Sequence, residues 1–592
     1  MNLSSTIKSI QDIMRKDDGV DGDAQRLGQL TWMLFLKVFD QREEEWEDDN
    51  QQYQSPLPER YRWRNWAAYI VDADGKKKPQ IAASDLVPFV NNELFPALKE
   101  QIDASQSPQH KVLKQVFEDA NNFMKSGPQM LAVIEKLEDA INFHDFKTRA
   151  NLGDVYEQML NDLRGAGNAG EFYTPRAITA FMADRVNPRL DKRESVMDPA
   201  CGTGGFLTAA IDHFRHQLSI KSSAEDKRAI EDLIHGIEKK QLPHLLCTTN
   251  MLLHGIDVPS QIEHKNTLAI GWNEWSANDK VDCIITNPPF GGYEDDGVGS
   301  DYPADLRTRE TADMFMALII KKLLKENGRA AVVLPDGFLF GDGIKGTLKK
   351  LLLRDCKLHT IIRLPKGVFA PYTTIKTNLL FFTKGSTVDD GTEHFHTDTI
   401  WFYEHPYPAG YKSYSKTKPI RLEEFKPEQE WWGNESNDFA DRVENEFAWK
   451  VDFKTKREQA EAAAQPHWQR AEDLNNQAAA LEGKARDLRN SLVGSTNAVY
   501  REKIDAQIAE LRAQAEPLRL QARDAQAAGD RLYWPIFNLD LKNPNAPEEE
   551  THDPDLLLKK YKKLLGEIEE TENQLKSELA AALAHHFVGE DA

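Results

Sequence analysis

The stretch Val281–Phe290, Val-Asp-Cys-Ile-Ile-Thr-Asn-Pro-Pro-Phe, constrains the fold of this chain more than any other. Its apolar and β-branched residues predict a short buried strand that stops at Asn287. Two consecutive prolines fix φ at about −65° and donate no hydrogen bond, so the backbone after Asn287 is stiff and extended. The Asn287 amide and the Pro288 carbonyl are thereby predicted to point two acceptors at one place, with the Phe290 ring beside them.

Two interpretations of this motif remain open when it is taken alone. A planar exocyclic amino group of a nucleobase offers two hydrogens to two acceptors, and its ring offers a face for stacking. The same residues are also typical of a turn that ends a strand.

A second strand and turn come earlier in the chain. Glu194–Met197 predicts a short strand, Asp198–Phe206 (Asp-Pro-Ala-Cys-Gly-Thr-Gly-Gly-Phe) is a glycine-rich turn, and Leu207–Leu218 predicts a helix. This order is typical of nucleotide-binding α/β folds, because glycines let the backbone approach a ligand. The turn lacks both the Gly-x-Gly-x-x-Gly spacing and a P-loop lysine. It therefore favours a zwitterionic or neutral ligand with an adenosine part over a triphosphate.

Polar residues follow or precede the neighbouring elements. The predicted strand Leu233–Ile237 ends in Glu238, at the position where a carboxylate usually binds ribose hydroxyls. Asn266 lies where a third strand loop would approach an adenine ring. Upstream, Glu171–Arg176 (Glu-Phe-Tyr-Thr-Pro-Arg) predicts the start of a helix with Thr174 as its N-cap.

The order of elements predicts an α/β fold. Strands alternate with helices from 194 to 384, which indicates a doubly wound sheet. Further strands are predicted at Ala330–Leu334, Leu358–Arg363 and Asn378–Thr383.

The flanking regions are predicted to be helical. We expect four parts: an N-terminal helical domain at 1–150, the α/β domain at 151–450, an antiparallel helical hairpin at 455–530, and a C-terminal segment at 531–592. The hairpin follows from heptad spacing on both sides of a break near Gly494. The last helix carries an apolar stripe and is expected either to fold back or to dock on another chain.

Composition limits the partners of the chain. Its formal net charge is −21, whereas proteins that bind duplex DNA unaided usually have a basic surface. The four cysteines lie far apart without a Cys-x-x-Cys pair, so neither a disulfide framework nor a metal site is predicted. The sequence shows no signal-peptide core and no apolar run of about 18 residues, which predicts a cytoplasmic protein and no membrane partner.

In order and spacing, the motifs Glu171–Arg176, Asp198–Phe206 and Asn287–Phe290 resemble those of S-adenosylmethionine-dependent DNA amino-methyltransferases. The whole chain resembles the modification (methyltransferase, M) subunits of type I restriction–modification systems, which are bacterial or archaeal. The resemblance covers about 1–450 and the final segment, and the hairpin at 455–530 is a departure that looks like an insertion. It implies a Rossmann-like methyltransferase domain that methylates adenine N6 in DNA after base flipping.

The resemblance also implies site residues. The catalytic residues would be Asn287, Pro288, Pro289 and Phe290. The cofactor S-adenosyl-L-methionine would be bound by Glu171, Phe172, Tyr173, Thr174, Pro175, Arg176, Asp198, Ala200, Gly202, Thr203, Gly204, Gly205, Phe206, Glu238 and Asn266.

The partners follow from the same resemblance. Because nothing in the chain looks like a target-recognition domain, a separate specificity subunit is expected to read the DNA, embraced by two copies of this chain. A motor–nuclease subunit could join them, and the sequence leaves open whether one is present. The alternatives are a protein glutamine N5-methyltransferase, since a carboxamide NH2 poses the same chemical problem, and a stand-alone DNA methyltransferase. The intact Asn287–Phe290 argues against a non-catalytic scaffold.

Overall fold

The structure is a computed structural model that describes residues 3–144, 152–153, 155–158, 160, 173–219, 222–386, 393–493, 497–546 and 554–587. Glu171 and Phe172, both predicted to bind the cofactor, lie outside the described residues. The chain forms two compact units, Met1–Lys542 and Asn543–Ala592, which are described separately.

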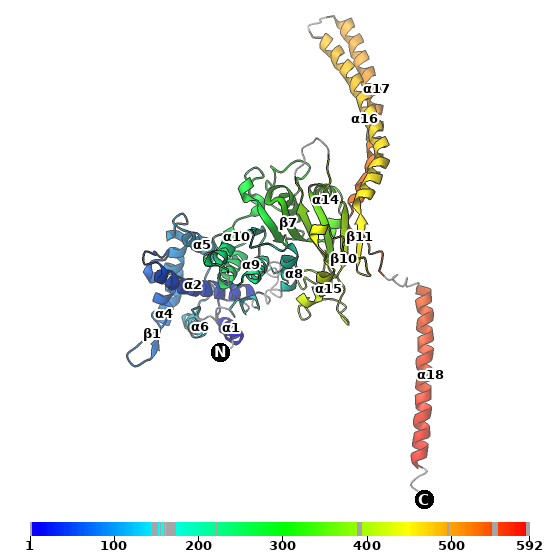
Figure 1. Ribbon diagram of the computed structural model, residues 1–592. Helices are drawn as coiled ribbons and strands as arrows, with labels where there is room; N and C mark the ends of the chain where they lie inside the picture. Colours follow the sequence, from blue (N-terminus) through cyan, green and yellow to red (C-terminus); the bar gives the residue numbers. More distant parts are fainter. Residues whose placement is uncertain are drawn as a thin grey trace. The chain divides into compact units, whose positions relative to one another are not determined.

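The first unit is built on a large sheet, of which β7, β10 and β11 are labelled in Figure 1. Within the described residues this sheet has nine strands, in the order β11-β10-β8-β9-β7-β6-β3-β4-β5. The strands are β3 (Val196–Asp198), β4 (Ile234–Glu238), β5 (Ile262–His264), β6 (Val281–Thr286), β7 (Leu324–Pro335), β8 (Cys356–Arg363), β9 (Thr377–Lys384), β10 (Thr399–Glu404) and β11 (Ala448–Asp452). Strand β9 is antiparallel to both neighbours and β11 is antiparallel to β10, while the other pairs are parallel.

The sheet is buried on both faces, which explains the continuous apolar run in β6. Cys283 and Ile285 pack into a hydrophobic cluster with helices α8 (Arg176–Val186) and α9 (Gly205–Gln217). Ile284, between them, points into the opposite cluster, which contains residues of α12 (Thr311–Leu318) and α14 (Ile344–Asp355). Successive side chains of a strand point to opposite faces, so a strand covered by helices on both sides has no polar alternation. The predicted doubly wound α/β fold is confirmed.

The chain reverses its winding direction between β3 and β6. From β3 the chain continues to β4 and β5 on one side, and it returns to β6 on the other side, where Met197 pairs with Ile284. A ligand crevice forms at the carboxyl ends of the strands at such a point. Asp198 is the last residue of β3 and Asn287 follows the last residue of β6, so both lie at this crevice.

The two strands at one edge of the large sheet were not predicted from the sequence. Strands β10 and β11 extend the sheet beyond β8, and 43 residues with several prolines separate them. Trp449 of β11 stacks on Phe402 of β10 with ring centroids 5.2 Å apart. This cross-strand contact joins segments distant in the sequence, so no local pattern indicated it.

The other helices and strands of this unit complete the layers. They are α1 (Leu3–Met14), α2 (Asp23–Asp49), α3 (Trp63–Trp66), α4 (Ala83–Phe89), α5 (Pro108–Phe117), α6 (Gly127–Ala140), α10 (Ala224–Leu233), α11 (Gln241–Leu253), α13 (Asp336–Phe340), α15 (Lys426–Trp431), and the strand pair β1 (Ile70–Val71) and β2 (Lys77–Lys78). Short 3-10 turns lie at Glu59–Tyr61, Thr267–Ala269, Ala277–Asp279, Leu422–Phe425, Glu435–Asn437 and Trp534–Phe537, and π-helical turns at Val90–Leu94, Ala97–Gln101 and Ile319–Leu323.

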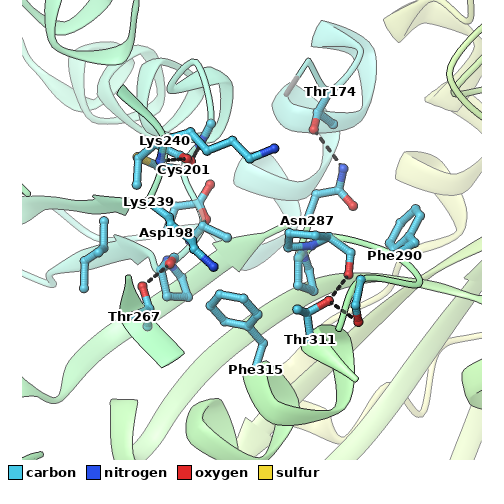
Figure 2. A pocket seen from close by; sticks show the side chains of 18 of the residues that line it. Thr174, Asp198, Cys201, Lys239, Lys240, Thr267, Asn287, Phe290, Thr311 and Phe315 are labelled. Atoms are coloured by element: carbon cyan, nitrogen blue, oxygen red, sulfur yellow. Dashed lines mark hydrogen bonds between the residues drawn. The ribbon is translucent and has the colours of Figure 1, made fainter. Parts of the chain in front are cut away.

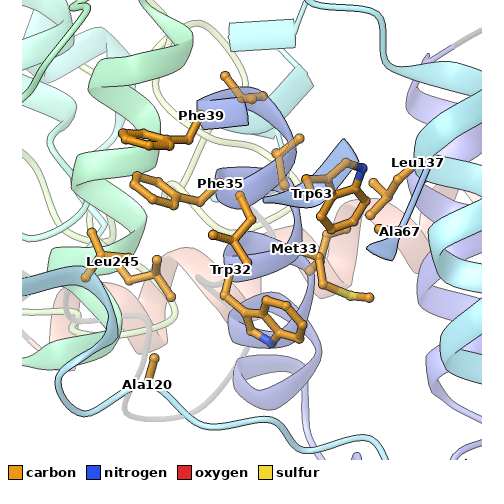
Figure 3. Packing of buried hydrophobic residues seen from close by; sticks show 14 of the residues in the cluster. Trp32, Met33, Phe35, Phe39, Trp63, Ala67, Ala120, Leu137 and Leu245 are labelled. Carbon is orange, nitrogen blue, oxygen red and sulfur yellow. The ribbon is translucent and has the colours of Figure 1, made fainter. Parts of the chain in front are cut away.

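The N-terminal helices share a core with the sheet domain. Helix α2 is the centre of this core, with Trp63 of α3 on one side and Leu245 of α11 on the other (Figure 3). Trp32 and Phe35 of α2 are fully buried. Because α11 also follows Glu238 at the crevice, the helical region packs directly on an element that carries the site.

Two long helices, α16 (Phe453–Ser491) and α17 (Ala498–Tyr533), lie side by side (Figure 1). They correspond to the predicted heptad segments. Buried small residues recur every seven positions along both helices: Ala464, Ala471, Ala478 and Ala485 in α16, and Ala515, Ala522 and Gly529 in α17. A Cβ on Gly529 would lie 2.6 Å from the Trp468 ring, so the helices approach closely there.

The second unit contains α18 (Pro554–Phe587). Its apolar stripe is exposed to solvent along the helix: Leu557, Tyr561, Leu564, Ile568, Leu575 and Leu579. None of the helices in the described part of the chain is long and apolar enough to cross a membrane.

Candidate active site

A cavity of about 300 Å³ opens at the carboxyl ends of β3, β4 and β6 (Figure 2). Its walls come from the start of α8, the glycine turn after β3, the loops after β4, β5 and β6, the start of α12 and the β8–β9 loop. The residues are Tyr173, Thr174, Asp198, Pro199, Ala200, Cys201, Gly202, Thr203, Gly205, Phe206, Ile237, Glu238, Lys239, Lys240, Asn266, Thr267, Asn287, Pro288, Pro289, Phe290, Gly292, Tyr293, Glu294, Thr311, Phe315, Phe369 and Tyr372.

Two buried carboxylates organise the glycine turn from different sides. Asp198 accepts hydrogen bonds from the Ala200 amide at 3.0 Å and from the Thr286 hydroxyl at 2.6 Å. Glu238 accepts from the Gly202 amide at 3.0 Å and from its own loop at the Lys240 amide at 2.7 Å. Since Thr286 immediately precedes Asn287, Asp198 links the glycine turn to the Asn-Pro-Pro-Phe loop.

Glycine is required within the turn at one position by close packing. Gly204 has φ +83°, and a Cβ there would lie 2.8 Å from the Cys247 sulfur and 3.0 Å from the Met251 terminal carbon. Both residues belong to α11. The left-handed conformation and the close approach of α11 together exclude a larger residue.

Burial shifts the protonation of both carboxylates. It raises the pKa of Asp198 to about 7, and the hydrogen bonds from Thr286 and Ala200 oppose this shift without cancelling it. Burial also raises the pKa of Glu238. Charged carboxylates without a cation nearby are costly to bury, so this half of the cavity suits a ligand with a positive group or several hydroxyl donors.

Asn287 is held in one orientation at the other half of the cavity. Its Nδ2 donates to the Thr174 hydroxyl at 3.1 Å, while its Oδ1 is buried and has no hydrogen-bond partner among the described residues. Figure 2 shows this hydrogen bond between Asn287 and Thr174 on the side of the cavity that also carries Phe290. The structure also corrects the prediction that Thr174 is an N-cap: α8 is preceded by Pro175, no side chain caps it, and the Thr174 hydroxyl is used by Asn287.

The loop after Asn287 is fixed by the first residue of α12. The Thr311 hydroxyl donates to the Pro289 carbonyl at 3.0 Å, and the Thr311 amide donates to the Gly292 carbonyl at 3.0 Å. Proline donates no backbone hydrogen bond, so the carbonyl is the backbone group through which Thr311 can hold Pro289.

An aromatic wall stands beside this loop. The Phe290 and Phe369 rings meet edge to face, with centroids 6.2 Å apart and planes at 80°. Tyr372, from the same β8–β9 loop as Phe369, also lines the cavity and is 40% exposed. Phe369 and Tyr372 were not predicted as site residues, and the only sequence signal was two aromatic residues around Pro371.

Lys239 and Glu294 join the loops after β4 and β6. The Lys239 ammonium contacts the Glu294 carboxylate at 2.9 Å, and Asn266 Nδ2 donates to the same carboxylate at 3.0 Å. Asn266 Oδ1 accepts from the Leu268 amide at 3.1 Å. Asn266 therefore lines the cavity as predicted, but its amide already binds protein groups. Neither Lys239 nor Glu294 was predicted, because the contact spans 55 residues.

Most of the predicted site residues that the structure describes meet in this cavity. They are Tyr173, Thr174, Asp198, Ala200, Gly202, Thr203, Gly205, Phe206, Glu238, Asn266, Asn287, Pro288, Pro289 and Phe290. Pro175, Arg176 and Gly204 are not among the lining residues, and the Arg176 guanidinium pairs instead with Glu157 and with Asp212, the latter at 3.1 Å. Within the described residues no group of three or more His, Cys, Asp or Glu side chains could hold a metal ion.

Comparison with known families shows to which class of protein this fold and this site belong. The N-6 DNA Methylase family model matches residues 147–476, and the HsdM N-terminal domain model matches residues 3–142. The chain belongs to the N-6 DNA methylases.

The relatives identify the branch of this family. The chain is 49% identical over 585 residues to the type I restriction enzyme EcoEI methylase subunit of Escherichia coli, and the match covers 99% of each chain. It is 28% identical over 438 residues to the EcoKI methylase subunit of Escherichia coli K12, covering 72% of this chain and 75% of the relative. The chain is therefore a methylase subunit of the type I restriction enzyme family, an adenine-N6 DNA methyltransferase.

Solved structures agree with this assignment. A chain from a type I restriction–modification system, solved to describe complex assembly and conformational transition, matches with a TM-score of 0.68 and 28% identity over 98% of this chain and 99% of that chain. A modification subunit assigned to a type I restriction enzyme from Vibrio vulnificus YJ016 matches with a TM-score of 0.62 and 38% identity, covering 76% of this chain and 92% of that chain.

Proposed function

We propose that the cavity binds S-adenosyl-L-methionine next to Asp198 and Glu238 and a flipped adenine next to Asn287 and Phe290. The observation that carries this proposal is the buried Oδ1 of Asn287, an acceptor that faces the cavity without a partner among the described residues. A buried polar atom left unpaired is costly, and an amino hydrogen of the substrate would remove that cost.

The cofactor half of the cavity fits this ligand. The glycine turn permits a close backbone approach, Glu238 suits two ribose hydroxyls, and Asp198 suits the α-amino group at the methionine end. Lys240 and Thr203 complete this wall. When bound, the cofactor supplies an electrophilic methyl group on a sulfonium.

The other half of the cavity activates the nucleophile. The lone pair of adenine N6 is delocalised into the ring, so N6 is weakly nucleophilic. Asn287 Oδ1 and the Pro288 carbonyl accept its two hydrogens, which favours a pyramidal nitrogen with its lone pair aimed at the methyl group. Phe290 holds the ring by stacking, and proximity supplies much of the remaining rate enhancement. No charged base is needed, because N6 loses its proton to water after transfer, while the two oxygens stabilise its positive charge.

The proposal is tested by transferring labelled methyl groups to DNA that lacks the modification. The chain is purified with its co-expressed partner and incubated with labelled cofactor and unmethylated genomic DNA. Nucleoside mass spectrometry should find the label on N6-methyladenine. Label on cytosine, or on a glutamine side chain of a protein, would contradict the proposed substrate.

Thr174 is expected to set the orientation of the Asn287 amide. In a Thr174→Val variant the amide loses its hydrogen-bond partner and rotates more freely, so kcat should fall by about tenfold, the value of one hydrogen bond. Thr174→Ser keeps the hydroxyl and should restore kcat. Single-turnover methylation measures the rate, and cofactor affinity is measured in parallel. Equal kcat in the valine variant and the natural protein would contradict this role.

Cofactor binding is expected to depend on pH through Asp198. The pKa of Asp198 is raised to about 7 in the free protein, so the carboxyl is protonated below pH 7 and does not attract the α-amino cation. Affinity should therefore rise by up to about tenfold per pH unit toward pH 7 and then level off. Titration calorimetry from pH 5 to 8 measures it. Asp198→Asn should bind weakly at every pH, whereas the exposed control Asp191→Asn should retain the natural profile.

The same shift has a consequence for stability without cofactor. Between the ordinary carboxyl value of about 4 and the raised pKa of about 7, the folded chain holds a proton on Asp198 that the unfolded chain has released. The free energy of unfolding should therefore decrease as pH rises through this window. Saturating cofactor, by holding Asp198 in the ionised form that the unfolded chain also has in this window, should abolish this trend.

We infer that the chain works within a larger complex. DNA and other subunits of a restriction–modification system are its partners. A net charge of −21 supports the view that a separate specificity subunit supplies much of the DNA contact, with two copies of this chain around it. A motor–nuclease subunit would join this complex. The exposed stripe of α18 is the surface that we assign to subunit docking. We retain, as part of this proposal, the predicted division of the chain into four parts at 1–150, 151–450, 455–530 and 531–592.

A further inference from the structure

Two loop segments, the first of which lines part of the cavity, carry lysines and no acidic residue. They are 364–376, between β8 and β9, and 405–421, which follows β10. Their lysines are Lys366, Lys376, Lys412, Lys416 and Lys418. In a chain with a net charge of −21, these two segments are a local concentration of positive charge, and we call them together the lysine shelf.

The two segments form one surface because their backbones are in contact. The Tyr407 hydroxyl donates to the Lys366 carbonyl at 3.0 Å. Gly367 has φ +84°, and a Cβ there would lie 2.5 Å from the Tyr414 carbonyl oxygen. Tyr414 is 2% exposed and its hydroxyl donates to Glu424 at 2.5 Å, so it anchors the second segment to the core.

The shelf presents its lysines to solvent. Lys366, Lys412, Lys416 and Lys418 are exposed, and none has an acidic ion-pair partner among the described residues. A tight turn holds two of them in place, because Ser415 and Lys418 exchange two backbone hydrogen bonds of 3.1 Å. Lys418 also lies over the Tyr411 ring at 5.2 Å. Arg421 differs from these lysines, since it pairs with Glu424 at 3.1 Å.

The lysine shelf adjoins the half of the cavity that we assign to the flipped adenine, which we call the base pocket. Phe369 and Tyr372 belong to segment 364–376 and line the cavity, and Phe369 contacts Phe290. A strand that delivers a flipped base to Phe290 must therefore carry its flanking phosphates near these loops. Exposed lysines, serine and threonine hydroxyls, and tyrosine rings are the groups that bind phosphates and unstacked nucleotides.

We propose that the lysine shelf binds the phosphates of the DNA strand that carries the flipped adenine. This inference rests on the proposed function of the cavity. Contacts to phosphates do not read the DNA sequence. The lysine shelf places positive charge on the chain that carries Asn287, so it aligns the target strand with Asn287 for any recognition sequence.

The test combines three substitutions on the shelf, K412Q/K416Q/K418Q, with a matched triple on α16, K454Q/K456Q/K484Q. All six lysines are exposed. Each variant is purified in full length with the co-expressed specificity subunit. Methyl transfer to unmethylated genomic DNA is measured at salt concentrations from about 50 to 200 mM, and KM for DNA is plotted against salt on logarithmic axes. Each lost phosphate contact lowers the slope by about 0.9.

We expect the shelf triple to raise KM for DNA on the order of tenfold at low salt and to reduce the salt slope by about two to three, with kcat and cofactor affinity unchanged. The α16 triple should match the natural protein. A K412R/K416R/K418R variant retains the charge and should retain the slope.

An unchanged slope in the shelf triple would overturn the proposal, and so would a loss that the arginine triple does not restore. The proposed function fails separately, through absence of N6-methyladenine with the natural protein. If the natural protein is active and all variants have the same slope of KM against salt, only the proposal about the lysine shelf is rejected.

Discussion

Replacing Asn287 by alanine is expected to lower kcat for methyl transfer by roughly 10²–10³-fold, the usual cost of removing one preorganised group that stabilises charge in a transition state. The substitution removes the acceptor that is buried at the cavity and leaves the carboxylates of Asp198 and Glu238 in place. Affinity for S-adenosyl-L-methionine should therefore stay within about twofold, which separates a catalytic defect from a binding defect.

The measurement is single-turnover transfer of labelled methyl groups, with cofactor affinity determined by calorimetry on the same preparations. Asn273→Ala is the matched control, because Asn273 is an exposed asparagine of the same domain. Phe290→Ala should reduce transfer as well, with a larger effect on KM for DNA because it removes the stacking surface. Full activity in either the Asn287 or the Phe290 variant would reject the assigned base pocket.

Deleting residues 553–592 is expected to separate the chain from its specificity subunit. The six large apolar residues of the α18 stripe are between 49% and 69% exposed. Burying apolar surface contributes about 25 cal/mol per Å², so burial of this stripe against a partner would stabilise the complex strongly. A narrower change should have the same effect: Leu564→Asp combined with Ile568→Asp places two charges on the stripe. Both truncated and substituted chains should still bind cofactor.

Co-purification with a tagged specificity subunit measures this prediction. Asn573→Asp combined with Ser577→Asp adds the same two charges, four residues apart, on the opposite face of α18, and should leave the complex intact. Recovery of the full complex with the deletion would show that docking uses another surface. Loss of the complex in both paired variants would point to helix destabilisation rather than to the stripe.

Local sequence patterns were sufficient for much of the site. The strands ending at Asp198, Glu238 and Thr286 were predicted to within one residue at their carboxyl ends, because each is a short apolar run closed by a turn residue. The positions of Asp198 and Asn287 at one crevice follow from parallel pairing of β3 with β6. Strand order itself required the structure, since apolar runs in a buried sheet do not encode their neighbours.

The long-range side-chain contacts of the site could not be predicted from the spacing of residues in the sequence. Thr174 and Asn287 are 113 residues apart. Thr174 was predicted as a helix cap and a cofactor contact, and Asn287 as an acceptor for the substrate, so neither prediction indicated that the two side chains meet. The ion pair of Lys239 with Glu294 joins two loops in the same way. Side-chain contacts of this kind depend on how the helices and loops pack on the sheet. Many such packing arrangements are compatible with one local sequence pattern.

The sequence by itself determined the class of fold, the two ends of the crevice and the stiff Asn287–Phe290 loop, because backbone preferences of glycine, proline and β-branched residues act within a few positions. Only the tertiary structure decided which way the Asn287 amide faces, that Phe369 stands beside Phe290, and that 364–376 and 405–421 form one basic surface. Those features arise from packing between distant segments, where burial and close approach select one arrangement among many.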